Sequence, residues 1–159
     1  MTVQTDDLDS ALGPLAPFAG RWIGGGEGHY PTIDDFSYEE EIDLAWDGRP
    51  FLTYVSRTWS PGRAKPMHTE NGFLRRAGEA VELLITQPTG FAELHRGPVV
   101  GGVFAPEQLS LARSPDAKPV HSVRRTLTVA GDHFSYEFSM AHGDTPMTHH
   151  LSGRLHRAR

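Results

Sequence analysis

Apolar and polar side chains alternate with a period of two along most of this chain. One segment places four large apolar residues on one parity: Phe134, Tyr136, Phe138 and Met140. Residues 36–44 alternate in the same way, with acidic side chains on the second parity and Glu40 as a carboxylate on the apolar side. Alternate side chains of a strand lie on one face, so this pattern predicts half-buried antiparallel strands.

Short turns separate the alternating segments. Asp47-Gly48 and Gly131-Asp132 are hairpin signals, and loops rich in proline, glycine and serine occupy residues 60–66, 88–90 and 114–117. About ten short strands joined in this way predict an all-β fold, a single antiparallel up-and-down β-barrel, with a sandwich as the alternative. Such a barrel leaves no unpaired edge and has room inside for one small ligand.

The helical signal is confined to the N-terminal residues. We expect a short helical turn around Asp9–Leu12, because the two prolines that follow prevent its extension. The apolar residues of this segment favour a lid over one end of the barrel. We expect one domain over residues 1–159, with residues 1–12 as a flexible N-terminus.

A glycine-rich stretch follows at residues 20–33. Six residues share the even positions: Gly20, Trp22, Gly24, Gly26, Gly28 and Tyr30. Glycine loses much conformational entropy in a strand and packs nothing, so a bulky group should lie against this backbone, or the strand should bend sharply. The simpler interpretation is a bent edge strand in an ordinary sheet.

Composition narrows the function classes. The 159 residues suit one domain, the net charge is −5, and no basic tract is present, which argues against nucleic acid. No apolar run is long enough to cross a bilayer, and the polar N-terminus differs from a signal peptide. The absence of cysteine removes disulfides, thiolate metal sites and cysteine nucleophiles. We therefore expect a cytoplasmic protein without a membrane partner.

Nine histidines make a metal or haem hypothesis necessary. His149 and His150 are adjacent, so a regular strand directs them to opposite faces, and both rarely bind one metal. A three-histidine zinc site would need His68 or His142 from elsewhere in the fold and is not favoured. A single buried histidine among apolar neighbours suits haem iron, which needs one proximal imidazole. For most of the histidines a surface position is the simpler interpretation.

The glycine-rich stretch resembles the signature of the nitrobindins, haem-binding β-barrels distantly related to lipocalins and fatty-acid-binding proteins. The matching positions are Gly20-x-Trp22-x-Gly24-x-Gly26-x-Gly28-x-Tyr30-Pro31-Thr32-Ile33. Further matches follow in order: Phe36-x-Tyr38-x-Glu40-Glu41, Pro50-Phe51-Leu52-x-Tyr54, Arg57-Thr58-Trp59, Pro66-Met67-His68-x-Glu70-x-Gly72, Val81-Glu82-Leu83, Gln87-Pro88-Thr89-Gly90, Ala117-Lys118-x-Val120, Met140-Ala141 and His150-Leu151. The resemblance therefore covers nearly the whole chain.

The resemblance implies a site and an activity. His150 corresponds to the proximal iron ligand and so to the catalytic residue, Thr32 to a residue beside the haem, and Lys118 to a cation near a propionate. The implied pocket-lining residues are Phe36, Met67, His68 and Met140. The implied cofactor is one ferric haem b per chain, and the implied activity is isomerisation of peroxynitrite to nitrate, together with nitric oxide binding.

Parity and resemblance disagree in the last strand. The apolar residues Leu151 and Leu155 share parity with His149, whereas the resemblance selects His150. A β-bulge or a position at the barrel mouth would resolve the conflict, and His149 stays as the alternative ligand. In related barrels a tryptophan closes one end beneath an arginine, which here implies Trp22 with Arg154.

Two other functions are compatible with the sequence. The first is a haem-free barrel that binds a fatty acid or another small apolar ligand. The second is a sensor of haem or nitric oxide that signals through a separate partner. A homodimer is also compatible with the sequence.

Overall fold

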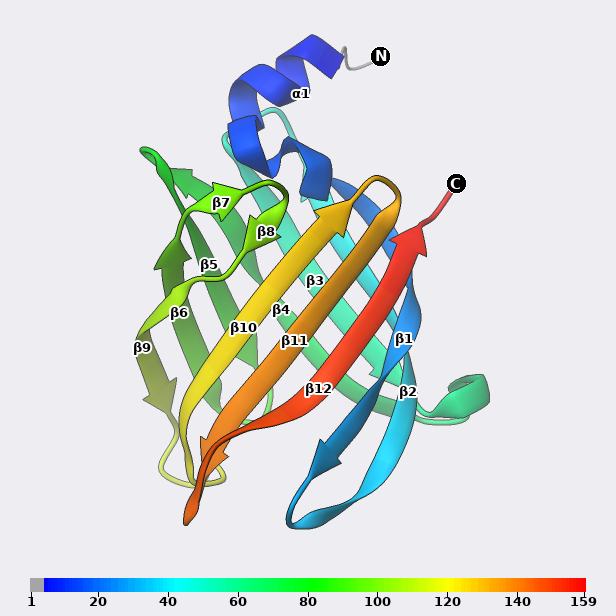
Figure 1. Cartoon of the computed structure of the whole chain (residues 1–159), viewed down its shortest axis with the longest axis vertical. Helices are drawn as coiled ribbons and strands as arrows, with labels where there is room; N and C mark the ends of the chain where they lie inside the picture. The colour runs from blue at the N-terminus through cyan, green and yellow to red at the C-terminus, as the bar shows by residue number, and fades with distance from the viewer. Residues whose placement is uncertain (1–4) are drawn as a thin grey trace.

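The chain folds into one twelve-stranded antiparallel sheet that curls into a barrel (Figure 1), as described by a computed structural model of residues 5–159. The predicted all-β barrel is confirmed, with two short strands more than expected. The helical segments are α1 (Thr5–Leu12), η1 (Gly13–Phe18) and η2 (Pro61–Arg63). The strands are β1 (Gly20–Tyr30), β2 (Ile33–Trp46), β3 (Phe51–Trp59), β4 (Pro66–Ala77), β5 (Ala80–Gln87), β6 (Phe91–Gly97), β7 (Val99–Val100), β8 (Val103–Phe104), β9 (Glu107–Arg113), β10 (Val120–Ala130), β11 (His133–His142) and β12 (Thr145–Arg157).

The sheet is a meander with one interruption. Its strand order is β7-β8-β10-β11-β12-β1-β2-β3-β4-β5-β6-β9, so β12 pairs with β1. The β7–β8 hairpin takes the place beside β10, and within residues 5–159 no backbone ladder joins β9 to β10. The side-chain oxygen of Gln108 instead accepts from the backbone N–H of Val123 at 2.7 Å. The expectation that the barrel leaves no unpaired edge is therefore wrong at this seam.

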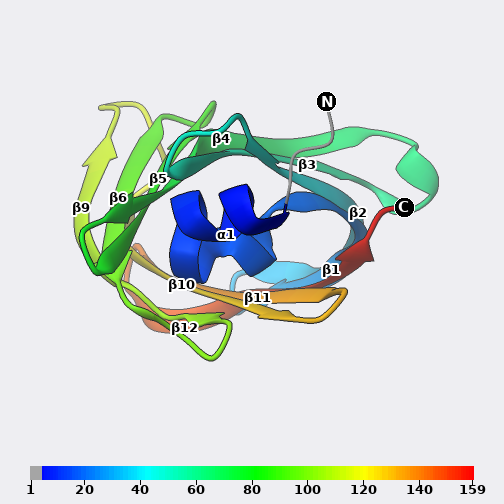
Figure 2. The ribbon, with the colours of Figure 1, turned by 90° about the horizontal axis from the view of Figure 1, so that it is seen from above.

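Helices α1 and η1 cover one end of the barrel (Figure 2), as the lid prediction expected. Leu12, Leu15 and Phe18 are fully buried there. Helix α1 is longer than the predicted turn, because it begins at Thr5. Flexibility of residues 1–12 stays a prediction, and residues 1–4 lie outside those described.

Trp22 closes the same end from β1. Its indole Nε1 donates to the carbonyl oxygen of Phe18 at 3.0 Å. The guanidinium carbon of Arg157 lies 4.2 Å from the centroid of the Trp22 ring, so the predicted partner Arg154 is wrong. The reason is register, since Trp22 lies opposite Arg157 in the β1–β12 ladder, whereas Arg154 lies opposite Gly25.

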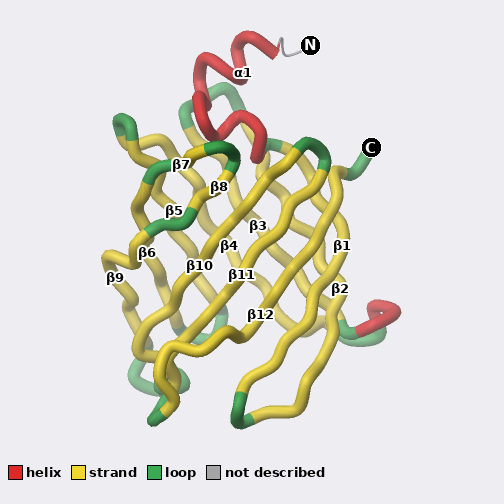
Figure 3. The backbone as a smooth tube through the Cα atoms, viewed as in Figure 1, coloured by secondary structure: helices red, strands yellow, loops and turns green. Residues whose placement is uncertain are grey.

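The two ends of the barrel differ in their filling. Apolar side chains pack the interior below the helices, among them Leu44, Leu52, Leu74, Leu83, Phe104 and Phe134. The far end, where the turn between β1 and β2 lies (Figure 3), is hollow. None of the helices in residues 5–159 has the length and apolar character needed to span a membrane.

The glycines of β1 make room for aromatic rings. Gly26 pairs with Gly153 of β12 and with Tyr38 of β2, and Gly153 pairs in turn with Tyr136 of β11. A Cβ atom on Gly153 would lie 2.1 Å from a carbon of the Tyr136 ring, and one on Gly26 would lie 2.4 Å from the Tyr38 hydroxyl. The expected bulky group is therefore present, and it consists of side chains from neighbouring strands.

Candidate functional site

The hollow end of the barrel contains a cavity of about 530 Å³, within the usual range for small-molecule sites. Most of its walls are apolar, and strands from all sides contribute. All seven predicted site residues line it: Thr32, Phe36, Met67, His68, Lys118, Met140 and His150. The structure therefore brings these residues together, while their individual roles toward a ligand stay predictions.

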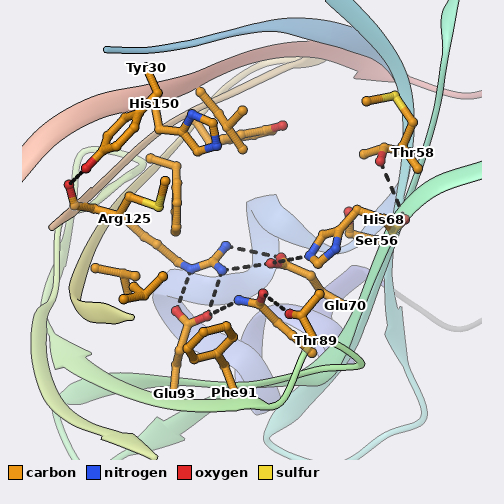
Figure 4. A pocket seen from close by; sticks show the side chains of 18 of the residues that line it. Tyr30, Ser56, Thr58, His68, Glu70, Thr89, Phe91, Glu93, Arg125 and His150 are labelled. Carbon is orange, nitrogen blue, oxygen red and sulfur yellow. Dashed lines mark hydrogen bonds and ion pairs between the residues drawn. The ribbon is translucent and has the colours of Figure 1, made fainter. Parts of the chain in front are cut away.

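A β-bulge in β12 directs His150 into the cavity. In the ladder with β11, Phe138 pairs with Leu151 but the next residue, Ser139, pairs with His149, so His150 is the extra residue. The bulge lets His150 and Leu151 both line the cavity, which removes the parity conflict. Figure 4 shows the His150 ring in the pocket beside Tyr30.

The His150 imidazole is held in one orientation. Its Nδ1 donates to the carbonyl oxygen of His29 at 3.1 Å, and Nε2 has no hydrogen-bond partner in the described part of the chain. The rings of Tyr30, Phe36 and Phe138 surround it, with centroid distances of 5.4, 6.1 and 6.1 Å. Burial lowers the pKa of His150, which favours the neutral imidazole that ligates metals.

The alternative ligand His149 does not line the cavity. Its Nε2 lies 2.5 Å from a carboxylate oxygen of Glu137, and its Nδ1 lies 2.8 Å from Nε2 of His29. The hydroxyl of Ser152 donates to the same Glu137 oxygen. These contacts hold His149 on the opposite side of β12 from the cavity.

The rim of the cavity combines apolar exposure with one cation. Ile33 is 49% exposed and Met67 is 46% exposed, although both line the cavity. Lys118 lies on the same lining, and no salt bridge to it is present among residues 5–159. A ligand that covers the rim would therefore meet apolar surface and an amine.

Sequence reasoning missed a buried ion cluster across the cavity from His150 (Figure 4). Arg125 donates to both oxygens of Glu70, at 3.1 and 2.8 Å, and to both oxygens of Glu93, at 2.8 and 2.9 Å. Burial alone would raise the pKa of each carboxyl group, but the guanidinium holds the pKa of Glu70 and of Glu93 below the usual range. The available signal was parity, because Arg125 shares the inward face of β10 with Val123 and Leu127.

Glu40 is a third buried carboxylate, with different partners. One of its oxygens accepts from the Tyr136 hydroxyl and the other from the Ser56 hydroxyl, both at 2.6 Å. The hydroxyl of Tyr38 lies 2.5 Å from that of Tyr136. Burial raises the pKa of Glu40 to about 7, since its hydrogen bonds only partly offset desolvation. The sequence showed Glu40 on the apolar parity but not these partners.

The cavity offers one coordinating nitrogen and several proton-active groups. The free Nε2 of His150 can serve as a single axial ligand to a metal held by a larger planar group. Among residues 5–159, no three His, Asp or Glu side chains are grouped so as to hold a bare metal ion. The geometry therefore suits a metal that arrives within an organic cofactor.

Comparison with known proteins gives a consistent result. A family model described as "THAP4-like, heme-binding beta-barrel domain" matches residues 11–157. The chain is 54% identical to peroxynitrite isomerase 1 of Rhodococcus jostii, over 98% of this chain and 89% of that protein. It is 42% identical to the peroxynitrite isomerase of Nocardia farcinica, over 94% and 92%. The crystal structure of Rv2717c from M. tuberculosis aligns with a TM-score of 0.84 and 37% identity, over 94% of this chain and 99% of that one.

Proposed function

Because this chain belongs to the family of THAP4-like, heme-binding β-barrel domains, we propose that it binds haem and isomerises peroxynitrite to nitrate. The observation that carries the proposal is the bulge that turns His150, with a free Nε2, into an apolar cavity. The names of the relatives support the choice of reaction. One ferric haem b per chain, nitric oxide binding and a cytoplasmic location are finer parts of the same proposal.

The residues fit a haem in three respects. His150 offers a neutral imidazole whose Nδ1–H is fixed by the His29 carbonyl group, the usual arrangement for an oriented metal ligand. Phe36 and Met140 contribute apolar surface of the kind that covers a porphyrin face. Lys118 and Thr32 also line the cavity, and an amine and a hydroxyl group there are suitable partners for a propionate and for a polar ring edge.

Each residue then has a physical task in the reaction. Bound haem supplies a Lewis-acidic, redox-active iron. The Nε2 lone pair of His150 would hold that iron, and the amine of Lys118 would hold a propionate at the rim. The apolar walls would exclude water and enclose the substrate, which limits the escape of reactive species. Isomerisation of the anion consumes no net proton, so the reaction leaves the protonation of the cavity residues unchanged at its end.

The test is an absorption spectrum after addition of haemin. We expect wild-type protein to develop a Soret band, which His150→Ala loses or shifts because the axial ligand is gone. His149→Ala is the matched control, since this neighbouring ring lies outside the cavity, and it should keep the wild-type band. The assignment would be refuted if His150→Ala kept the wild-type Soret band and catalysed peroxynitrite decay at the wild-type rate.

A haem-free barrel for a fatty acid is the second candidate, and the cavity lining favours it less. Fatty-acid carboxylates need an available cation inside the barrel. Arg125 lines the cavity but is already neutralised by Glu70 and Glu93, and the amine of Lys118, unpaired among residues 5–159, lies at the rim. Failure of the wild-type chain to take up haemin would nevertheless leave a small apolar ligand as the better proposal.

A further inference from the structure

We propose that Tyr136 is a one-electron donor in the cavity wall, that Glu40 accepts its proton, and that nitrogen dioxide from peroxynitrite is the oxidant it reduces. The proposal rests on the proposed function in one respect, because peroxynitrite is the source of the oxidant. It concerns protein side chains, so it can be tested with or without bound haem.

All four tyrosines of the chain line the cavity, which gives an internal comparison. Their hydroxyl groups differ in the acceptor they meet. Tyr136 donates to Glu40 at 2.6 Å, and Tyr54 donates to Glu70 at 3.0 Å. Each of the remaining two meets a different kind of oxygen: Tyr30 the carbonyl of Met140 at 3.0 Å, and Tyr38 the hydroxyl of Tyr136.

The acceptor decides whether a buried phenol can give up an electron. Burial, together with the nearby Glu40 carboxylate, raises the pKa of Tyr136 well above its ordinary value, so a phenolate is not available. The electron must therefore leave together with the proton, and the driving force grows with the basicity of the acceptor. Geometry alone qualifies Glu40, since its oxygen is already hydrogen-bonded to the Tyr136 hydroxyl.

The acceptors of Tyr54 and Tyr30 are poorer bases than Glu40. Both oxygens of Glu70 accept from Arg125, which stabilises the ionised form and weakens the base. The Met140 acceptor of Tyr30 is a backbone carbonyl, which takes up no proton near neutral pH. Glu40 accepts only hydroxyl hydrogen bonds among the described residues, from Tyr136 and Ser56. It is therefore the carboxylate that can receive a proton.

The fold is built to hold this phenol pair. Tyr136 and Tyr38 come from β11 and β2, which are separated by β12 and β1. The paired residues Gly153 and Gly26 of those two strands carry no side chain, so the two rings meet above them. Tyr38 can then restore Tyr136 by passing its own electron to Tyr136 and its proton to the Tyr136 oxygen.

Homolysis of the O–O bond of peroxynitrous acid supplies nitrogen dioxide together with a hydroxyl radical, and the steps that follow balance without further reactants. Tyr136 loses one electron to nitrogen dioxide, which becomes nitrite, while the phenolic O–H bond breaks and the proton passes to the ionised Glu40 carboxylate. A second nitrogen dioxide forms a C–N bond to the ring carbon next to the phenoxyl oxygen, and the hydrogen of that ring carbon moves as a proton to the oxygen, which restores the phenol. The net products are one nitrotyrosine, one nitrite and one proton from one tyrosine and two nitrogen dioxide molecules.

The experiment treats the full-length chain with peroxynitrite, once without and once with added haemin. Freeze-quenched electron paramagnetic resonance detects the tyrosyl radical, and peptide mass spectrometry locates nitro groups. We expect Tyr136 and Tyr38 to carry at least about tenfold more nitration than Tyr54 and Tyr30, because of the difference in acceptor basicity. Equal nitration of all four tyrosines would overturn the proposal.

Three variants test whether Glu40 acts by accepting the Tyr136 proton or only by holding the Tyr136 ring in place. Glu40→Gln keeps an oxygen to accept from Tyr136 but cannot take its proton, so radical yield and nitration at Tyr136 should fall about tenfold. Tyr136→Phe should also lower nitration of Tyr38, whose phenol loses its neighbour, whereas Tyr54→Phe should leave Tyr136 unchanged. Unchanged Tyr136 nitration in folded Glu40→Gln would refute the role of Glu40.

Failure of the proposed function gives a different result. Haemin uptake by the same wild-type preparation is read from the Soret band. A chain that takes up no haemin but nitrates at Tyr136 and Tyr38 would contradict the haem proposal and support the phenol pair. A chain that takes up haemin and shows no preference among its tyrosines would do the reverse.

Discussion

Three buried glutamates line the same cavity, yet their neighbours give them different proton affinities. Glu70 and Glu93 share Arg125, which keeps both ionised. Glu40 has only hydroxyl partners, so burial raises its pKa to about 7 from an ordinary value of 4.5. At the scale of residues, the distance to one guanidinium therefore decides which carboxyl group can exchange a proton near neutral pH.

This difference predicts a pH-dependent stability. Between pH 4.5 and about 7 the folded chain holds a proton on Glu40 that the unfolded chain releases, so the contribution of Glu40 falls as pH rises. The full loss is about 3 kcal/mol. Chemical denaturation across this range measures the free energy of unfolding of wild type and of Glu40→Gln. As pH rises, the wild type should lose stability relative to the variant.

The difference between the two proteins isolates Glu40 from other titrating groups. The lowered pKa of His150 favours folding as pH rises, but it acts equally on both proteins. The paired carboxylates Glu70 and Glu93 lose their contribution only as pH falls below about 4.5, which is outside the range. A pH-independent difference would contradict the assignment.

At the scale of elements, β1 and β12 form the wall that carries the site. Their glycines leave the inner surface bare, so Tyr38, Phe36 and Tyr136 can cover it. The bulge in β12 then adds one residue to the same wall and turns His150 inward. A strand poor in side chains is thus stabilised by the rings of its neighbours.

Gly153→Ala tests this account. The new methyl group would meet the rigid Tyr136 ring, and overpacking of this kind costs about 1–3 kcal/mol of unfolding free energy. The measurement is denaturant unfolding of the variant and of wild type.

The matched background is Tyr136→Ala, which removes the ring that the methyl group would meet. The cost of Gly153→Ala should be smaller in that background, as a coupling in a double-mutant cycle. Additive costs would show that the Tyr136 ring is not what excludes a side chain at Gly153.

At the scale of the whole molecule, stability and ligand site lie at opposite ends of one barrel. The helices and the apolar core fill the end that Trp22 closes, and the cavity occupies the opposite end, where the β1–β2 turn lies. Substitutions below the helices should therefore change stability more than ligand uptake.

Phe18→Ala should cost about 3–5 kcal/mol of unfolding free energy, because this ring is fully buried and packs edge-on against Phe134. Under conditions in which the variant is fully folded, its haemin uptake should stay near the wild-type level, since Phe18 does not line the cavity. Thermal unfolding and haemin titration measure the two quantities.

The control is Leu109→Ala on β9, a residue that is 52% exposed and should change stability by less than about 0.5 kcal/mol. A loss of haemin uptake in folded Phe18→Ala would show that the two ends of the barrel are coupled.

The sequence by itself determined the faces of the strands and the gathering of site residues. The alternation in β11 identified its inward residues, and the glycines of β1 indicated close contact with bulky groups. Parity is a local property, because successive side chains of any strand point to opposite faces. The resemblance added the seven predicted residues, which the fold places around one cavity.

Only the tertiary structure decided what depends on register and closure. Three features follow from the register and pairing of the strands. They are the bulge at His150, the contact of Trp22 with Arg157 and not with Arg154, and the unpaired edge at β9. The cluster of Arg125 with Glu70 and Glu93 joins strands far apart in the sequence. One amino-acid sequence shows which side chains of a strand share a face, but the pairing of distant strands decides which of these side chains are in contact.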